Sequence, residues 1–135
     1  MKYLLDVNAL VALGFLQHEF HERVASWLHI LTSKNTPELV TCSITELGFV
    51  RVLAQAPQYG ITIAHARALL LRLKRGKTLS FAFIPDDHDI SRIPAWVKTA
   101  NQTTDGHLAE LAKANDAVLA TFDRGIPGAY VIPHT

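Results

Sequence analysis

Short apolar runs alternate with longer segments of helical periodicity along the whole chain of 135 residues. Because strands that alternate with helices pair in parallel, the alternation predicts an α/β sandwich with a mainly parallel sheet. The expected strands cover residues 2–5, 38–42, 78–84, 117–122 and 129–133. The expected helices cover residues 9–16, 18–34, 43–55, 62–75 and 104–115, and the stretch 85–102 is predicted as loop with a short helix.

The bulk composition favours one globular domain spanning residues 1–135. Hydrophobic residues make up 49% and charged residues 19%, which excludes wholesale disorder. The single cysteine, Cys42, excludes an internal disulfide or a cysteine-based zinc site and suits a reducing cytoplasm. Asp6 and Asn8 interrupt the apolar start, so we expect no signal peptide, and no apolar stretch is long enough to predict a membrane span. The net charge of +1 restricts any nucleic-acid surface to a local patch.

Four carboxylates interrupt apolar surroundings at one predicted edge of the sheet. Asp6 ends the first strand and Asp123 follows the strand at 117–122, so both stand at strand carboxyl ends. Glu46 and Asp105 stand in the first turns of two helices, each aligned with the apolar face of its helix. Helix N-termini in this architecture point to the same edge as the strand carboxyl ends, where open α/β sheets bind ligands. The four acids are therefore expected to converge.

Converging carboxylates repel one another, so they must bind protons or a cation. No comparable set of lysines accompanies them in the sequence, and a divalent metal is the simplest solution. All-oxygen ligands favour Mg²⁺ or Mn²⁺ over zinc or copper. Since magnesium sites are often completed by substrate phosphate, the pattern indicates a phosphodiester substrate.

Each acid also has a purely structural explanation, which stays open at this stage. Asp6 or Asn8 could cap the first helix, and Glu46 could form a capping box with Ser43. Asp105 could be a first-turn acid that the helix dipole favours, and the acid in "FDRG" could belong to an ordinary turn.

Four segments in order resemble the motifs of PIN-domain ribonucleases, most closely the VapC-type toxins of bacterial toxin–antitoxin pairs. The segments are "LLDVNAL" (4–10), "SITELGFVR" (43–51), "TTDGHLAELAKAND" (103–116) and "AVLATFDRGI" (117–126). The resemblance implies a three-layer α/β/α sandwich, a homodimer, and inhibition by an antitoxin protein. Residues 85–102 match no part of the family pattern.

By the same resemblance, the acidic pocket for Mg²⁺ or Mn²⁺ consists of Asp6, Glu46, Asp105 and Asp123. Asn8, Thr104 and Thr121 match supporting polar positions of the family. The implied reaction is hydrolysis of RNA: Asp6 and Asp105 hold a metal, Glu46 helps to ligate it or orients the attacking water, and Asp123 completes the shell or supports a second ion.

Contacts to RNA are assigned by proximity to these acids. Arg51 and Arg124 are candidates for phosphate contacts, and so is the basic run at 72–77, for which a solvated helix end is the simpler interpretation.

Other polar or aromatic residues are given structural interpretations. His18 and His21 are expected on the surface, "DDHD" (86–89) in a solvated turn, and His107 on the outward side of its helix. Trp27 and Trp96 are expected in the core or in a dimer contact, not as base-stacking platforms.

Two competing functions remain. A phosphatase could use Asp6 as a covalent nucleophile, but such enzymes usually carry a second acid two residues later, where this chain has Asn8. A non-catalytic RNA-binding module would not need the intact set of four acids.

Overall fold

The structure is a computed structural model that describes residues 1–134, which form five helices and five strands. The strands are β1 (Lys2–Leu5), β2 (Glu38–Thr41), β3 (Ser80–Phe83), β4 (Ala117–Thr121) and β5 (Tyr130–Val131). The helices are α1 (Val7–Gly14), α2 (His21–Lys34), α3 (Ser43–Gln55), α4 (Ile63–Arg75) and α5 (Thr103–Ala114). Short 3₁₀ turns cover Pro57–Tyr59, Ile90–Arg92 and Ala100–Gln102.

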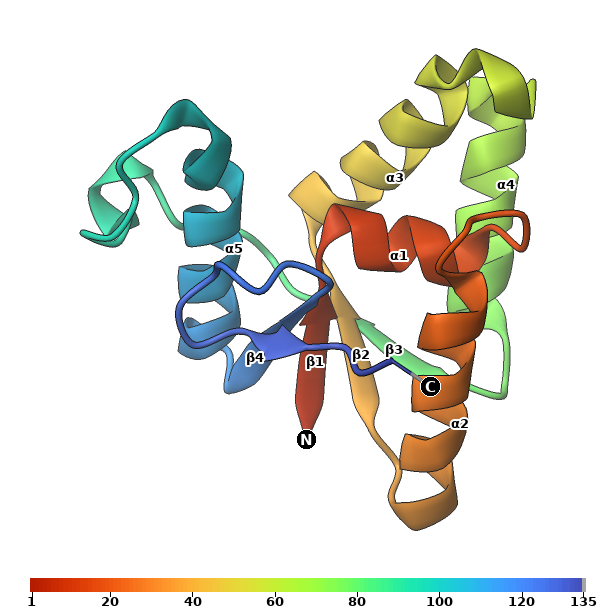
Figure 1. Cartoon of the computed structure of the whole chain (residues 1–135), viewed down its shortest axis with the longest axis horizontal. Helices are drawn as coiled ribbons and strands as arrows, with labels where there is room; N and C mark the ends of the chain where they lie inside the picture. The colour runs from red at the N-terminus through yellow and green to blue at the C-terminus, as the bar shows by residue number, and fades with distance from the viewer. Residues whose placement is uncertain (135) are drawn as a thin grey trace.

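The strands form one sheet in the order β3-β2-β1-β4-β5, and every neighbouring pair is parallel. Helices α1 to α4 lie on one side of this sheet and α5 lies on the other (Figure 1). The predicted three-layer α/β/α sandwich with a parallel sheet is therefore confirmed. Because all strands run the same way, their carboxyl ends share one edge, where α1, α3 and the end of β4 meet.

The strands are buried on both faces, so successive side chains enter different hydrophobic clusters. Tyr3 and Leu5 of β1 pack in the cluster under α1 to α4, whereas Leu4 packs in the cluster under α5. The second cluster also contains Leu108 and Leu111 of α5. Apolar residues at consecutive positions of one short strand are what a parallel sheet covered on both faces requires.

Several predicted boundaries shift because local hydrogen bonds decide them. The first helix begins at Val7, since Asp6 and not Asn8 is its N-cap. The third helix is capped at Cys42 and not at Ser43, because the backbone N–H of Cys42 donates to the hydroxyl of Thr45. The capping box predicted for Ser43 and Glu46 is therefore wrong, and the Glu46 side chain is free for other contacts.

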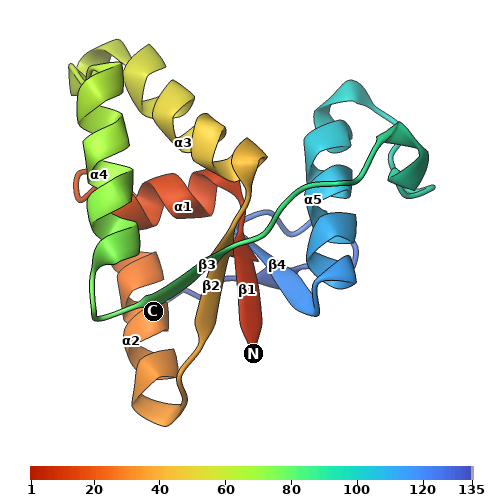
Figure 2. The same ribbon diagram turned by 180° about the vertical axis from the view of Figure 1, so that it is seen from behind.

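The segment that leaves β3 crosses the sheet toward α5. The backbone N–H of Ile84 donates to the carbonyl of Thr41 at 2.9 Å, which continues the contact between β3 and β2. The chain then passes across the face of β2 and β1 that is turned to the viewer in Figure 2, and continues to α5. Where the sequence predicted loop plus a short helix, the structure has an extended crossing with two 3₁₀ turns. None of the helices in residues 1–134 combines the length and apolar character needed to cross a membrane.

Gly48 sets the distance between α1 and α3, which carry two of the candidate acids at or beside their first turns. A Cβ atom at Gly48 would lie 2.5 Å from Cγ2 of Val7, the first residue of α1. Real Cβ contacts are longer, so a larger residue here forces the two helices apart.

We predict that Gly48→Ala destabilises the fold by about 1 kcal/mol, because overpacking outweighs the better helix propensity of alanine. Urea unfolding measures this cost. The matched test is the double variant with Val7→Ala, in which the added methyl group has room. An equal cost of Gly48→Ala in both backgrounds would contradict the packing explanation.

Candidate metal centre

Asp6 lies between β1 and α1 and is nearly buried, with 8% of its surface exposed. Its Oδ1 accepts a hydrogen bond of 2.8 Å from the backbone N–H of Ala9, so the carboxylate caps α1. Its Oδ2 accepts a hydrogen bond of 2.5 Å from the hydroxyl of Thr121. The capping interpretation of Asp6 is therefore confirmed, and the same two bonds orient the carboxylate at the sheet edge.

Thr121 connects Asp6 to the acid that follows β4. It is the last residue of β4, which pairs directly with β1, and its side chain is buried. Its hydroxyl oxygen also accepts the backbone N–H of Asp123 at 3.0 Å. The exposed carboxylate of Asp123 accepts the N–H of Gly125 at 2.7 Å, which is the turn contact that its sequence context suggested. Thr121 thus occupies a supporting position between two candidate acids.

The three aspartates influence one another's ionisation. Burial raises the pKa of Asp6, and the charges of Asp105 and Asp123 raise it further, against the hydrogen bonds from Thr121 and Ala9. Burial also raises the pKa of Asp105, to which the charge of Asp123 adds. Asp105 comes from the first turn of α5, as predicted. Strands β1 and β4 and helix α5 therefore bring these three negative groups into electrostatic reach.

This arrangement fits a cation, although its ligands are not drawn together. Within residues 1–134, no three His, Cys, Asp or Glu side chains are arranged so that they could share a metal ion. In the same described range, none of the three aspartates forms a salt bridge. Their charges are thus uncompensated by the protein, and carboxylate oxygens are the donors that hard divalent cations prefer.

Glu46 has a different environment from the aspartates. Its Oε2 accepts hydrogen bonds from the hydroxyl of Thr41 at 2.6 Å and from Nζ of Lys74 at 2.5 Å. Thr41 ends β2 and Lys74 belongs to the last turn of α4. The sequence showed no set of lysines that could compensate the four acids, but one lysine, Lys74, does pair with Glu46. The basic run at 72–77 was interpreted as a solvated helix end, but one of its residues, Lys74, is partly buried and contacts Glu46.

The remaining predicted residues lie on the surface of the protein. Asn8 is exposed in the first turn of α1, and Thr104 is exposed in the first turn of α5, next to Asp105. Arg51 and Arg124, the candidates for phosphate contacts, are exposed as well. Their roles stay predictions.

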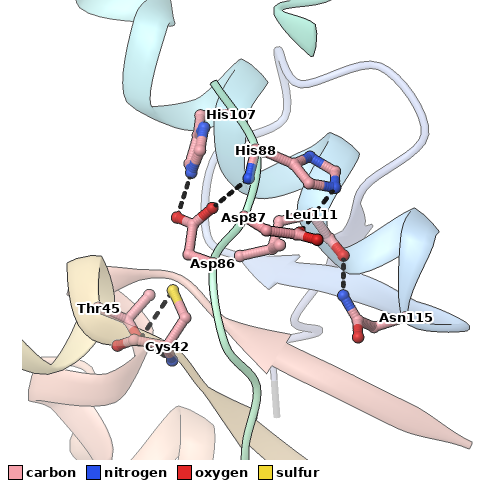
Figure 3. A network of polar contacts seen from close by, with 8 residues as sticks. All are labelled: Cys42, Thr45, Asp86, Asp87, His88, His107, Leu111 and Asn115. Atoms are coloured by element: carbon pink, nitrogen blue, oxygen red, sulfur yellow. Dashed lines mark hydrogen bonds and ion pairs between the residues drawn. The ribbon is translucent and has the colours of Figure 1, made fainter. Parts of the chain in front are cut away.

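The segment from 86 to 88 and His107 form a polar network that the sequence analysis missed (Figure 3). Oδ2 of Asp86 lies 2.5 Å from Nε2 of His107, and Oδ1 of Asp86 accepts the backbone N–H of His88. Burial alone would raise the pKa of Asp86, but the bonds from His107 and His88 outweigh it and leave the pKa lowered. Contrary to the prediction, His107 is therefore not on a solvent-facing side but partly buried against Asp86. Asp87 and Asp89 are exposed, as expected for a solvated turn, whereas Asp86 and His88 are not.

The two tryptophans and the histidines at 18 and 21 have structural roles, as expected. Trp27 is buried in the core, whereas Trp96 packs at the edge of the cluster under α5. His21 and His18 are half-buried instead of exposed, because each uses a ring nitrogen in a backbone hydrogen bond.

The sequence matches the PIN domain family over residues 3–131. Ribonuclease VapC44 of Mycobacterium tuberculosis is 38% identical over 140 residues, which cover 96% of this chain and 94% of that protein. Ribonuclease VapC38 of the same species is 39% identical over 127 residues, covering 91% of this chain and 86% of that protein.

Two solved structures share the fold. One is VapBC2 from Rickettsia felis bound to a DNA fragment from their promoter, with a TM-score of 0.62, 15% identity, and 96% of each chain covered. The other is the Sarcin-Ricin loop cleaving toxin VapC20 of Mycobacterium tuberculosis, with a TM-score of 0.60, 8% identity, and 98% of this chain and 99% of that chain covered.

The raised pKa of Asp105 gives a signed stability prediction. A raised folded-state pKa means that stability falls as pH rises from the unfolded value of 3.8 through the folded value, and that it stays lowered at neutral pH. We therefore predict that Asp105→Asn stabilises the metal-free protein at pH 7 by roughly 0.5 kcal/mol, a figure kept small by solvent screening at this half-exposed group.

Urea unfolding with a chelator at pH 7 and at pH 3.5 measures this difference, which should vanish at the lower pH. Added Mn²⁺ should stabilise the wild-type chain more than the variant. A variant that is less stable than wild type at pH 7 in chelator would show that Asp105 carries no repulsive strain.

Proposed function

Because this chain belongs to the PIN domain family, we propose that it is an endoribonuclease and the toxin of a toxin–antitoxin pair. Its substrate is RNA, which it hydrolyses at phosphodiester bonds with the help of a divalent cation. Two independent observations support this proposal. Relatives that are 38% and 39% identical over nearly the whole chain are named ribonucleases of the VapC type. The charge of Asp123 raises the pKa of both Asp6 and Asp105, beyond the effect of burial, at the edge of the sheet where α/β proteins bind ligands.

The aspartates are the residues that we propose as the metal ligands, with Asp6 and Asp105 in direct contact and Asp123 completing the shell. Since all the donors are carboxylate oxygens, Mg²⁺ or Mn²⁺ is the expected ion. When bound, the cation polarises the phosphate and lowers the pKa of a water molecule.

The protein's own residues prepare this site. Thr121 and the N–H of Ala9 hold both oxygens of Asp6, so the carboxylate keeps one orientation as charge develops nearby. Thr41 holds Oε2 of Glu46, and we propose that Glu46 orients the attacking water and accepts its proton. Arg51 and Arg124 are proposed to contact the phosphates of the RNA, with Asn8 and Thr104 as polar support at the rim.

The two competing functions lack comparable support. A phosphatase with Asp6 as nucleophile would need an acid two residues later, and Asn8 is an exposed amide there. Both oxygens of Asp6 also accept hydrogen bonds, which lowers their nucleophilicity. A non-catalytic RNA-binding module gives no reason for three uncompensated aspartates at one edge.

We predict that Asp6→Asn lowers divalent-dependent RNA cleavage by at least about 10³-fold while the fold is kept, because the amide still accepts from Ala9 but no longer binds the cation. Cleavage of total RNA with Mg²⁺, Mn²⁺ or chelator measures the effect, and circular dichroism checks the fold. Asp87→Asn is the control, since Asp87 is fully solvated and outside the site. Full activity of the Asp6 variant in a clean preparation would refute the function.

We also propose that the chain forms a homodimer and is inhibited by a cognate antitoxin protein. VapBC2, which shares the fold, is a complex of this class. Light scattering of the purified chain should give twice the monomer mass of 14.9 kDa. Co-expression with the product of an adjacent small reading frame should yield a complex that no longer cleaves RNA. A monomer that no neighbouring gene product binds would contradict both proposals. The expected cytoplasmic location stays a prediction.

A further inference from the structure

Arg23 stands in the first turn of α2, where its half-buried side chain is fixed by several contacts. Its Nε donates to the backbone carbonyl of Ile132 at 3.0 Å and lies 3.3 Å from the carbonyl oxygen of Pro133, and Nη2 also donates to Ile132. The guanidinium carbon lies 4.9 Å from the centre of the Phe122 ring and 5.8 Å from that of Phe20. Packing therefore sets the position of this cation before any ligand binds.

These contacts connect Arg23 to the end of β4, where Thr121 and Asp123 are located. The backbone N–H of Ile132, whose carbonyl accepts from Arg23, donates to the carbonyl of Thr121 at 2.8 Å. Phe122, the closer of the two rings, immediately precedes Asp123 in the chain. The cation therefore lies between α2 and the end of β4, at the same edge of the sheet as the candidate acids.

A second guanidinium lies within electrostatic reach of the first. Arg124 is exposed and directly follows Asp123. Burial lowers the pKa of Arg23, and the positive charge of Arg124 lowers it further, whereas no carboxylate contributes to the shift. Neither arginine forms a salt bridge with another residue of the range 1–134. Two neighbouring cations without a counter-ion repel each other, and an anion shared between them removes that cost.

The contacts of Arg23 leave part of its donor set available. A guanidinium has five N–H groups in a planar fork. The backbone carbonyls accept from Nε and Nη2, while Nη1 has no acceptor among the residues that the structure describes. Because carbonyls carry no net charge, they orient the group without neutralising it. Phosphate oxygens match both the charge and the geometry of such a fork.

We propose that Arg23 and Arg124 together bind one backbone phosphate of the RNA substrate between α2 and the end of β4. Their location favours RNA over an acidic protein segment, since Asp123 stands in the chain between Arg124 and the ring under Arg23. A strand held there adjoins one of the proposed metal ligands. This inference rests on the proposed function for the identity of the strand, but RNA binding is measured without cleavage.

The experiment is a titration of a short, fluorescently labelled single-stranded RNA of mixed sequence with the full chain. Fluorescence anisotropy is read in chelator at several KCl concentrations. Arg23→Gln and Arg124→Gln should each weaken RNA binding about fivefold, because each removes a charged contact. The double variant should weaken binding by less than the product of the two single effects, since both cations share one phosphate. It should also reduce the slope of log affinity against log salt by about 0.7, the value for one phosphate contact on a single strand.

Two further variants are the controls. Lys34→Gln removes the same charge from an exposed position at the other end of α2, so affinity and salt slope should equal those of wild type. Arg23→Lys keeps the charge but loses the fork, so it should keep the slope and bind about twofold more weakly. Thermal unfolding of each variant checks the fold, and the exposed Arg124 can be tested even if Arg23→Gln fails to fold.

Three results would overturn the proposal. A lower Tm of Arg23→Gln with unchanged RNA affinity would mean that Arg23 only fastens the segment after β5. A loss of affinity confined to Arg124→Gln would mean that the two cations do not act together. If both variants bind RNA like wild type but no longer bind a co-expressed neighbouring protein, the pair serves a protein partner.

The outcome is separable from that of the proposed function. If wild type cleaves RNA with Mg²⁺ but the arginine variants keep full RNA affinity, only the role of the arginine pair is wrong. If the variants lose RNA affinity as expected but wild type cleaves no RNA with any divalent cation, the phosphate site stands and the ribonuclease function fails.

Discussion

Repulsion among carboxylates at one edge of the sheet is the interaction on which the rest of this structure depends. A parallel sheet places the carboxyl ends of β1 and β4 side by side, and α5 adds its first turn from the opposite layer. Burial raises the pKa of Asp6 and of Asp105, and the charge of Asp123 raises both further, with Asp105 adding to the shift of Asp6. A fold tolerates such a concentration of like charge when function requires it, because a cation or a substrate removes the penalty.

The structure manages this penalty in two ways. Asp6 is held by hydrogen bonds to Thr121 and Ala9, which favour its charged form without adding a positive group. Glu46 instead forms a salt bridge with Lys74 of α4, so a positive group of the protein itself balances its charge. Asp6 and Glu46 therefore differ in what offsets their negative charge, hydrogen bonds in one case and a lysine in the other.

The segment between β3 and α5 packs against α5 and thereby helps to position Asp105 in its first turn. A Cβ atom on Gly106 would lie 2.3 Å from Cγ2 of Val97, so the crossing segment packs directly on the first turn of α5. Asp86 and His107 join the same two segments through a charged hydrogen bond. Residues 85–102, which match no part of the family pattern, thus support the turn that carries Asp105.

The sequence by itself determined the layers, the parallel sheet and the places of Asp6, Asp105 and Asp123, since strand and helix periodicity and the position of a residue after an apolar run are local properties. Only the tertiary structure decided that Lys74 reaches Glu46 and that Asp86 reaches His107. These partners are 28 and 21 residues apart, and whether such side chains meet depends on how α4 and the crossing segment pack. Local patterns indicate which face of a helix turns inward, but not which polar group of another element that face will contact.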